Sequence, residues 1–188
     1  MKRGFTVLNF ISAVAFGLFV AWFLIWIADG INQKPGNTTG TDSSLQSTVI
    51  QGQNIPTPTG YVNDTAGVLS PATVSANEAK LVAFSESGKG EVAVLIVKSL
   101  NGLSIEEYGI RVGEAWKVGK YGVDNGNILI ISTGDRKVRI ETGSGSSITD
   151  GEAAKIISDY MLPSLKKNDW DNAVSNGVEG IIKGTYDN

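Results

Sequence analysis

The stretch WKVGKYGVDNGNILIISTGDRKVRIET, residues 116 to 142, decides the fold. Its residues 128 to 131 form an uninterrupted apolar run, which is typical of a strand covered on both faces. Gly134 and Asp135 supply a tight turn, and the alternation of charged and apolar residues after them predicts a second strand. Asp124-Asn125-Gly126, just before the first strand, tolerates left-handed backbone and offers oxygen atoms. The stretch therefore predicts a strand pair with an oxygen-rich loop at one end.

The composition limits the chemistry that the chain can perform. It contains no cysteine and no histidine, which excludes disulfides, thiolate nucleophiles, Ser-His-Asp triads and histidine-ligated metals. Catalysis would have to use carboxylates, Lys, Arg, Tyr, hydroxyls, amides or a hard cation bound by oxygen. The 16 basic and 19 acidic residues give a net charge of -3, which argues against nucleic acid as a partner.

The amino terminus predicts one transmembrane helix. Residues 5 to 27 carry no charge, and a helix needs about 20 apolar residues to cross a bilayer. The run is too long for a signal-peptide core, and no small-residue cleavage site follows it. Lys2 and Arg3 precede it and Asp29 follows it, which places the amino terminus in the cytoplasm. We expect residues 1 to 28 to be a signal anchor and the remaining chain to lie in a periplasmic, extracellular or lumenal space.

A second interpretation of the amino terminus is a prepilin leader. The sequence KRGFTVL from Lys2 resembles leaders that are cut after a glycine, before a phenylalanine. Asn9 stands where pilins carry a glutamate, so a pilin-like filament subunit is the weaker alternative. An uncleaved Met1 on the mature protein would exclude it.

Residues 29 to 59 are rich in Gly, Ser, Thr, Asn, Gln and Pro. Such a segment buries too little apolar surface to offset its chain entropy, which predicts a flexible tether. The remaining residues, 60 to 188, have the usual size of one domain.

The sequence of the domain predicts a small mixed sheet between helices. Ser70, Ser104 and Asp169 are expected to cap helices, and Glu107 completes a capping box with Ser104. The expected elements, with residues 61 to 70 as a loop, are a helix at 71–87, a strand at 91–100, a helix at 104–116, the strand pair, a helix from 150 to about 162 and a helix from 169 onward. This order predicts an α/β/α sandwich.

Three short motifs fail in their context. GEAWKVGK from Gly113 resembles a phosphate loop, but its glycine spacing is too long and it follows a helix. Asp169 and Asp171 resemble the carboxylate pair of aspartate-nucleophile phosphatases, but no apolar strand precedes them, which favours capping. The sequence TGSGSS from Thr142 fits an anion-binding loop and a flexible loop equally well.

Two loops remain candidates for a cation site. Asp64 and Asp124 each stand beside an amide side chain, Asn63 and Asn125. Carboxylate, amide and backbone oxygens are the ligands of Ca²⁺ and Mg²⁺. The alternative is an Asx-turn at each position, which the local chemistry alone favours.

The chain also resembles the TPM domain family. The resemblance covers residues 61 to 185 and rests on the order and spacing of its motifs. These are VND and AGVL from Val62, WKVG from Trp116, DNG from Asp124, RKVRIETGSG from Arg136, Pro163, and NDW from Asn168.

This resemblance implies an α/β/α domain that is exported and often tethered to a membrane. It implies acid phosphatase activity or calcium binding in some members, with the metal near loops at one end of the sheet. For this chain the implied metal ligands are Asn63, Asp64, Asp124 and Asn125, with Gly126 allowing a close backbone approach. Family members commonly have leucine and glutamate where this chain has Ser146 and Ser147, so one expected carboxylate is missing.

Two functions follow as expectations. The first is a tethered module that binds calcium or magnesium and assists a membrane or envelope protein complex in assembly, stability or repair. The second is a metal-dependent acid phosphatase, in which Arg136 and Arg139 bind the phosphate. The missing glutamate favours the first, and enzymatic activity stays an open question.

Overall fold

The computed structural model describes residues 55–187. The predicted membrane anchor and most of the predicted tether lie outside this range. Within it, no helix is both long and apolar enough to span a bilayer.

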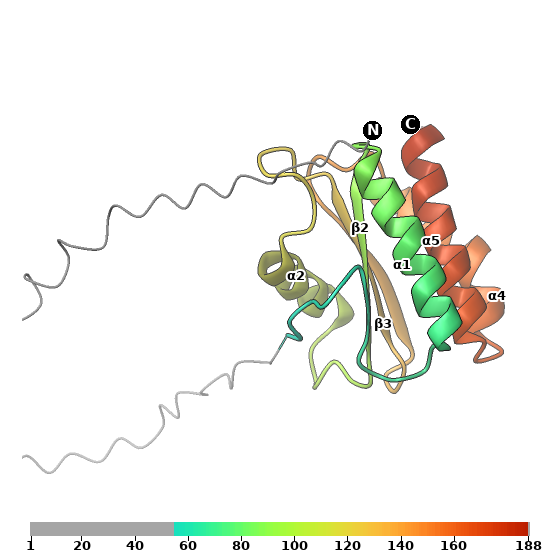
Figure 1. The fold of residues 1–188 in the computed structure, drawn as a ribbon. Helices are drawn as coiled ribbons and strands as arrows, with labels where there is room; N and C mark the ends of the chain where they lie inside the picture. Colours follow the sequence, from blue (N-terminus) through green and yellow to red (C-terminus); the bar gives the residue numbers. More distant parts are fainter. Residues whose placement is uncertain (1–54, 188) are drawn as a thin grey trace, which may run out of the picture. The chain divides into compact units, whose positions relative to one another are not determined.

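Four strands and a series of helices make up the described chain (Figure 1). In chain order they are β1 (Val62–Asp64), α1 (Pro71–Glu86), β2 (Glu91–Val97), α2 (Ile105–Trp116), β3 (Gly126–Ser132), β4 (Lys137–Thr142), α3 (Asp150–Ile156), the π-helical η1 (Ile157–Met161), α4 (Leu162–Leu165) and α5 (Trp170–Asp187). The predicted α/β class and the small mixed sheet are confirmed.

The strands form one sheet in the order β1-β2-β3-β4. β1, β2 and β3 run parallel, and β4 returns antiparallel to β3. Helices α1 and α2, which connect the parallel strands, lie on opposite faces of the sheet, although both connections step in the same direction across it. The two crossovers therefore have opposite hands, and one departs from the right-handed rule.

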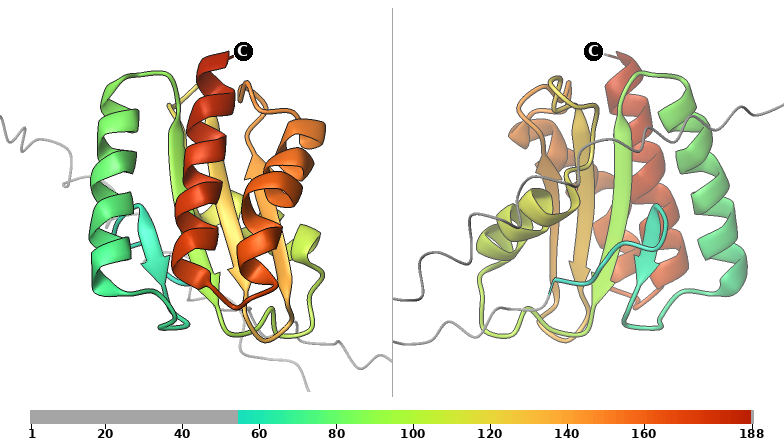
Figure 2. Two further views of the ribbon diagram at one scale, coloured as in Figure 1. Left: turned by 90° about the vertical axis from the view of Figure 1, so that its right-hand side faces the viewer. Right: turned by 60° about the vertical axis from the view of Figure 1, so that its left-hand side comes forward.

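The sheet has an apolar layer on each face because its central strands are apolar on both sides. Successive side chains of β2 point to opposite faces of the sheet, so that Val94 belongs to one apolar cluster and Leu95 to the other. One cluster is covered by α1, α5 and the α3–α4 segment, the other by α2 (Figures 1 and 2). Every residue of β3 is buried, which confirms that its apolar run is covered on both faces.

The segment predicted to be a loop before the first helix contains a strand. β1 has only three residues and pairs with β2, with Asn63 opposite Leu95. Two of its residues are polar, so neither alternation nor an apolar run marks it in the sequence. Its pairing with the apolar β2 makes it a strand.

The chain before β1 belongs to the domain. Ile55 packs against the α2-side cluster, and the Trp116 indole N–H donates to the Pro56 carbonyl at 2.7 Å. The Thr59 N–H donates to the Asn63 side chain at 2.7 Å. The domain thus includes Ile55, ahead of the predicted boundary at residue 60.

The predicted helix caps are confirmed, except for one capping box. The Ser70 and Ser104 hydroxyls accept from the N–H groups of Thr73 and Glu107, and the Asp169 carboxylate accepts from the Asn172 N–H. The Glu107 carboxylate, which the capping box would use, instead pairs with Arg111 at 2.6 Å. A complete capping box occurs one helix later, between Thr149 and Glu152.

Pro163 does not end the third predicted helix. The helix continues through the π turn η1 into α4, and the Leu162 N–H bonds to the Ile157 carbonyl, five residues back. A π turn widens the backbone ahead of a proline, which has no N–H to donate and whose ring would clash in a regular helix.

The free edge of β1 is closed by a side chain of α1. The two carboxylate oxygens of Glu78 accept from the N–H groups of Tyr61 and Val62 at 2.9 and 2.8 Å. These donors would otherwise stand unpaired on an edge strand.

Replacing Glu78 with alanine is therefore expected to lower the free energy of unfolding by about 2 kcal/mol, because two backbone donors lose a charged acceptor. Glu86→Ala removes an exposed carboxylate from the same helix and should change stability by less than about 0.5 kcal/mol. Urea denaturation of both variants measures the difference. Equal stabilities would show that Glu78 contributes nothing to the edge.

Candidate functional site

The predicted cation ligands lie at opposite ends of the sheet. Because β1, β2 and β3 are parallel, Asp64 at the end of β1 is level with Ile96 and Ile131. Asp124 precedes Gly126, the first residue of β3. At about 3.3 Å per residue the two aspartates are on the order of 20 Å apart. The prediction of one site that contains both was wrong, because local sequence does not reveal strand direction.

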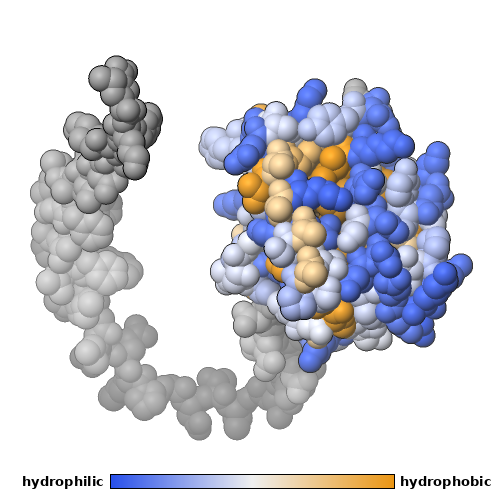
Figure 3. All heavy atoms as spheres, turned by 45° about the vertical axis from the view of Figure 1, so that its right-hand side comes forward, coloured by the Kyte–Doolittle hydropathy of each residue, from blue (hydrophilic) through white to orange (hydrophobic). Residues whose placement is uncertain are grey.

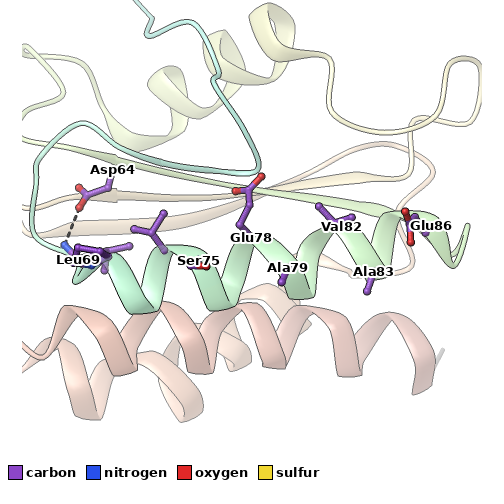
Figure 4. A pocket seen from close by; sticks show the side chains of 10 residues that line it. Asp64, Leu69, Ser75, Glu78, Ala79, Val82, Ala83 and Glu86 are labelled. Carbon is purple, nitrogen blue, oxygen red and sulfur yellow. Dashed lines mark hydrogen bonds between the residues drawn. The ribbon is translucent and has the colours of Figure 1, made fainter.

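Both carboxylate oxygens of Asp64 accept hydrogen bonds from its own loop. One carboxylate oxygen accepts from the Gly67 N–H at 2.8 Å, and the other accepts from Val68 and Leu69 at 2.8 and 2.7 Å. Figure 4 shows this carboxylate directed at Leu69, at one end of the shallow groove along α1. The Asp64 side chain thus bonds its local backbone, as in the turn alternative that the sequence left open, but at residues three to five positions on.

Asn63 also has a structural role. Its amide oxygen accepts from Thr59, and its amide nitrogen donates to the Gly60 carbonyl at 2.8 Å. The side chain is buried and fastens the segment before β1 to the sheet. Asn63 and Asp64 thus use their side-chain oxygen atoms for hydrogen bonds within the protein.

Asp124 anchors the loop at the other end. Its backbone is left-handed, with φ of 56°. One carboxylate oxygen accepts from the Ser144 N–H at 2.9 Å and from its hydroxyl at 2.8 Å. These two bonds, the backbone one foremost, hold the pKa of Asp124 below its ordinary value. The Asp124 carbonyl accepts from Gly145, so the loop is joined to the end of the hairpin at three points.

The next two residues support this geometry. The Asn125 side chain accepts from the Lys120 N–H at 3.0 Å and is buried. Gly126 lies against the Val118 carbonyl, which a Cβ at this position would overlap. Glycine is thus needed at position 126 for a close approach between two backbone segments.

A hollow of about 320 Å³ lies beside Asp124. It is lined by parts of α2, β3 and β4 and by the loops before β3 and after β4. Its acidic side chains are Glu114, Asp124 and Glu141, and Lys117 is its basic one. Glu141 pairs with Arg139 at 2.6 Å, so this arginine is held beside the hollow.

The donor set of this hollow fits a divalent cation only in part. Asp124 uses one of its oxygens for Ser144, and Glu141 pairs with Arg139. Among residues 55–187, no three acidic side chains form a group that could hold a metal ion.

Arg136 lies away from this hollow. It occupies the turn between β3 and β4, at the end of β3 remote from Asp124, and has φ of 55°. The structure therefore separates the two predicted phosphate-binding arginines from each other.

Sequence reasoning missed Glu114, Glu141 and Ser144. Glu141 alternates with the buried Ile140 and so faces α2. In the sequence, only its place in the alternation of β4 indicated the position of Glu141, and no pattern indicated Glu114. Ser144 meets Asp124 only because β4 returns beside β3.

The lowered pKa of Asp124 predicts a specific pH response. The stabilisation by the ionised carboxylate is complete above the ordinary aspartate pKa of about 3.9 and is lost as pH falls through the lower folded-state pKa. A ¹³C NMR titration should place the Asp124 midpoint below about 3.9. Ser144→Ala should raise the midpoint by removing the hydroxyl donor, whereas Ser158→Ala should not. A wild-type midpoint at or above the ordinary value would contradict the assignment.

The fold and part of the sequence are shared with known proteins. The chain is similar to the N-terminal domain of a protein from P. gingivalis, solved by NMR, with 30% identity and a TM-score of 0.62 over 66% of this chain and 80% of that one. It shares its fold with the N-terminal domain of the cg2496 protein from Corynebacterium glutamicum, with 18% identity and a TM-score of 0.55 over 71% of this chain and 84% of that one. A comparison with curated proteins found no match. The family model described as the TPM domain matches residues 62–184. The chain belongs to the TPM domain family.

Proposed function

We propose that this protein is a membrane-tethered, extracytoplasmic binding module that assists a membrane or envelope protein complex in its assembly, stability or repair. The binding surface that we assign is the DNG face, formed by Ile110, Glu114, Asp124, Glu141 and the loop at 120–123. The exposed apolar side chains on it carry the proposal. Ile110 is 52% exposed, Val123 is 51% exposed, and Tyr121 is fully exposed.

These side chains border a polar hollow. Ile110 lines the hollow together with Asp124, and Tyr121 and Val123 stand in the loop that leads to Asp124. Large apolar groups beside polar ones are typical of protein-binding surfaces, where an aromatic residue supplies much of the affinity. The acidic side chains of the hollow favour a partner segment that combines apolar and basic residues.

The loop at 120–123 is preorganised for binding because hydrogen bonds hold its base in place. Asp124 and Asn125 fix the base through Ser144, Gly145 and Lys120. An ordered base reduces the entropy that a partner must overcome on binding. The predicted tether adds to this, since it confines the domain near the bilayer and raises its local concentration around a membrane protein.

The lowered pKa of Asp124 argues against a role as general acid. A general acid needs a pKa near the working pH, whereas hydrogen bonds lower the pKa of Asp124. Asp124 is therefore an acceptor or a cation ligand. A calcium or magnesium ion on this face would take the second oxygen of Asp124, with Glu141 and water completing a weak site.

Site-specific cross-linking in cells tests the binding surface. A photoreactive side chain in place of Tyr121 is expected to form a discrete product with one membrane or envelope protein, identified by mass spectrometry. The same group in place of Val82, an exposed apolar residue of α1, is the matched control and should not form it. Identical product patterns at both positions would end the assignment of the DNG face.

A metal-dependent acid phosphatase is the second candidate. It is favoured by the position of Arg139 beside the hollow that Asp124 lines, since a guanidinium can bind phosphate. A bound cation would polarise the phosphoryl oxygen there. Arg139 would have to leave Glu141 to reach a phosphate.

Turnover of an aryl phosphate by the full chain, with calcium, magnesium or a chelator, decides this candidate. As a binding module the protein should show no turnover above Asp124→Asn, which tolerates the left-handed backbone and keeps the bonds from Ser144. Metal-dependent turnover that Asp124→Asn abolishes would establish the phosphatase instead. A thermal melt tests the cation separately, because a ligand at 100 times its dissociation constant adds about 2.7 kcal/mol.

A further inference from the structure

A second hollow lies at the opposite end of the sheet from the DNG face. It has a volume of about 160 Å³ and opens between the β3–β4 turn and the junction of α4 with α5. Its rim carries the exposed cationic side chains of Arg136, Lys137 and Lys166. Its apolar walls include Leu165 and the half-buried Trp170.

Within the described residues, Arg136 and Lys166 have no carboxylate of their own, and Lys137 attracts Asp135 without forming an ion pair with it. Arg136, Lys137 and Lys166 form none of the ion pairs found between residues 55 and 187, and no acidic side chain lines the hollow. The acidic side chains that are nearest to these cations in the sequence form hydrogen bonds with other groups. Asp135, which Lys137 attracts, accepts from the Leu100 N–H and the Ser132 hydroxyl, both at 2.6 Å.

Other acids near α5 are also occupied. The Asp169 carboxylate accepts from Asn172, at the start of α5. Asp171 accepts from the Ser70 N–H at 2.9 Å, which ties the start of α5 to the start of α1. These carboxylates keep their charge, but their oxygen atoms bond to other groups, which leaves Arg136 and Lys166 at the hollow to contact one guest.

The backbone holds these cations in place. Arg136 stands in a left-handed turn closed by β3 and β4, and Lys137 is paired with Ser132 in the ladder. Lys166 follows α4 and is fixed by the bond from its N–H to the Leu162 carbonyl at 3.0 Å. The cations therefore stand on two hydrogen-bonded parts of the fold, the β3–β4 hairpin and the end of α4, which fixes the backbone from which their side chains extend.

We propose that this hollow binds a small oxyanion joined to a flat apolar group. The cations receive the oxyanion, and Trp170 with Leu165 receives the apolar part. The volume is below the roughly 300–1,000 Å³ of clefts for drug-sized ligands, so the guest is a fragment such as an aryl phosphate or an aryl carboxylate. Three positive charges favour a dianion, hence the phosphate.

The site binds its guest without hydrolysing it. Ser132, the hydroxyl residue that lines the hollow, is fully buried and donates its proton to Asp135. No carboxylate of the lining is available to activate water. The proposal does not depend on the DNG face, which lies at the other end of the sheet.

Calorimetric titration of the full chain in non-ionic detergent tests the proposal. Phenyl phosphate is expected to bind saturably and about tenfold more tightly than inorganic phosphate, which lacks the apolar part, and phenol is expected not to bind. Tighter binding of phenyl phosphate than of benzoate assigns the site to phosphomonoesters, and the reverse order assigns it to carboxylates. Absence of saturable binding by both would overturn the proposal.

Charge-removing variants locate the binding. Lys166→Gln and Arg136→Asn should each weaken phenyl phosphate about tenfold, the loss of one charge-assisted contact of about 1.4 kcal/mol. Asparagine suits the left-handed backbone at position 136. Lys89→Gln removes an exposed cation at the other end of the sheet and should leave the affinity unchanged. An equal loss in all three variants would show non-specific attraction and reject the site.

NMR gives a check that does not depend on the variants. Phenyl phosphate should shift the indole N–H resonance of Trp170 and leave that of Trp116, at the far side of the sheet, in place. Equal shifts of both indoles would contradict binding in this hollow.

Discussion

The parallel ladder between β2 and β3 is the constraint on which the rest of the structure depends. It pairs both strands along their whole length, from Glu91 opposite Gly126 to Val97 opposite Ser132. Since both strands are apolar on each face, helices must cover the sheet on two sides. Because these strands run parallel, the chain must return from one end of the sheet to the other between each strand and the next. The loops before β3 and after β1 consequently open at opposite ends.

Carboxylates hold most of the connections in this domain. Asp64, Glu78, Asp124, Asp135 and Asp171 each accept at least one backbone N–H from a loop, a strand edge or a helix start. Hydrogen bonds of this kind lower the pKa of Asp124, Asp135 and Asp171. An acidic side chain used in this way orders backbone and has less capacity left for a metal or a substrate. The oxygen atoms that stand out in the sequence therefore serve, in the described part of the chain, to hold loops and helix starts in place.

The two ends of the sheet differ in charge and shape. Acidic side chains and exposed apolar ones meet at the DNG face, whereas cationic side chains border a hollow with an aromatic wall at the other end. The face of α1 and α5 is mixed, with small apolar areas among hydrophilic residues (Figure 3). One domain of modest size can therefore present two chemically distinct surfaces, because they lie at opposite ends of the sheet.

The sequence by itself determined the class of the fold, most of its elements, the caps at Ser70, Ser104 and Asp169, and the strained turn at Asp124. These features depend on neighbours within a few residues, so local pattern is enough to reveal them. β1, the ordered segment at Ile55 and the helix that continues past Pro163 were not predicted, because each depends on packing against a distant element. Only the tertiary structure decided which candidate residues meet. Strand direction separated Asp64 from Asp124, the return of β4 brought Ser144 to Asp124, and the packing of α4 beside the hairpin turn gathered Arg136, Lys137 and Lys166 around one hollow.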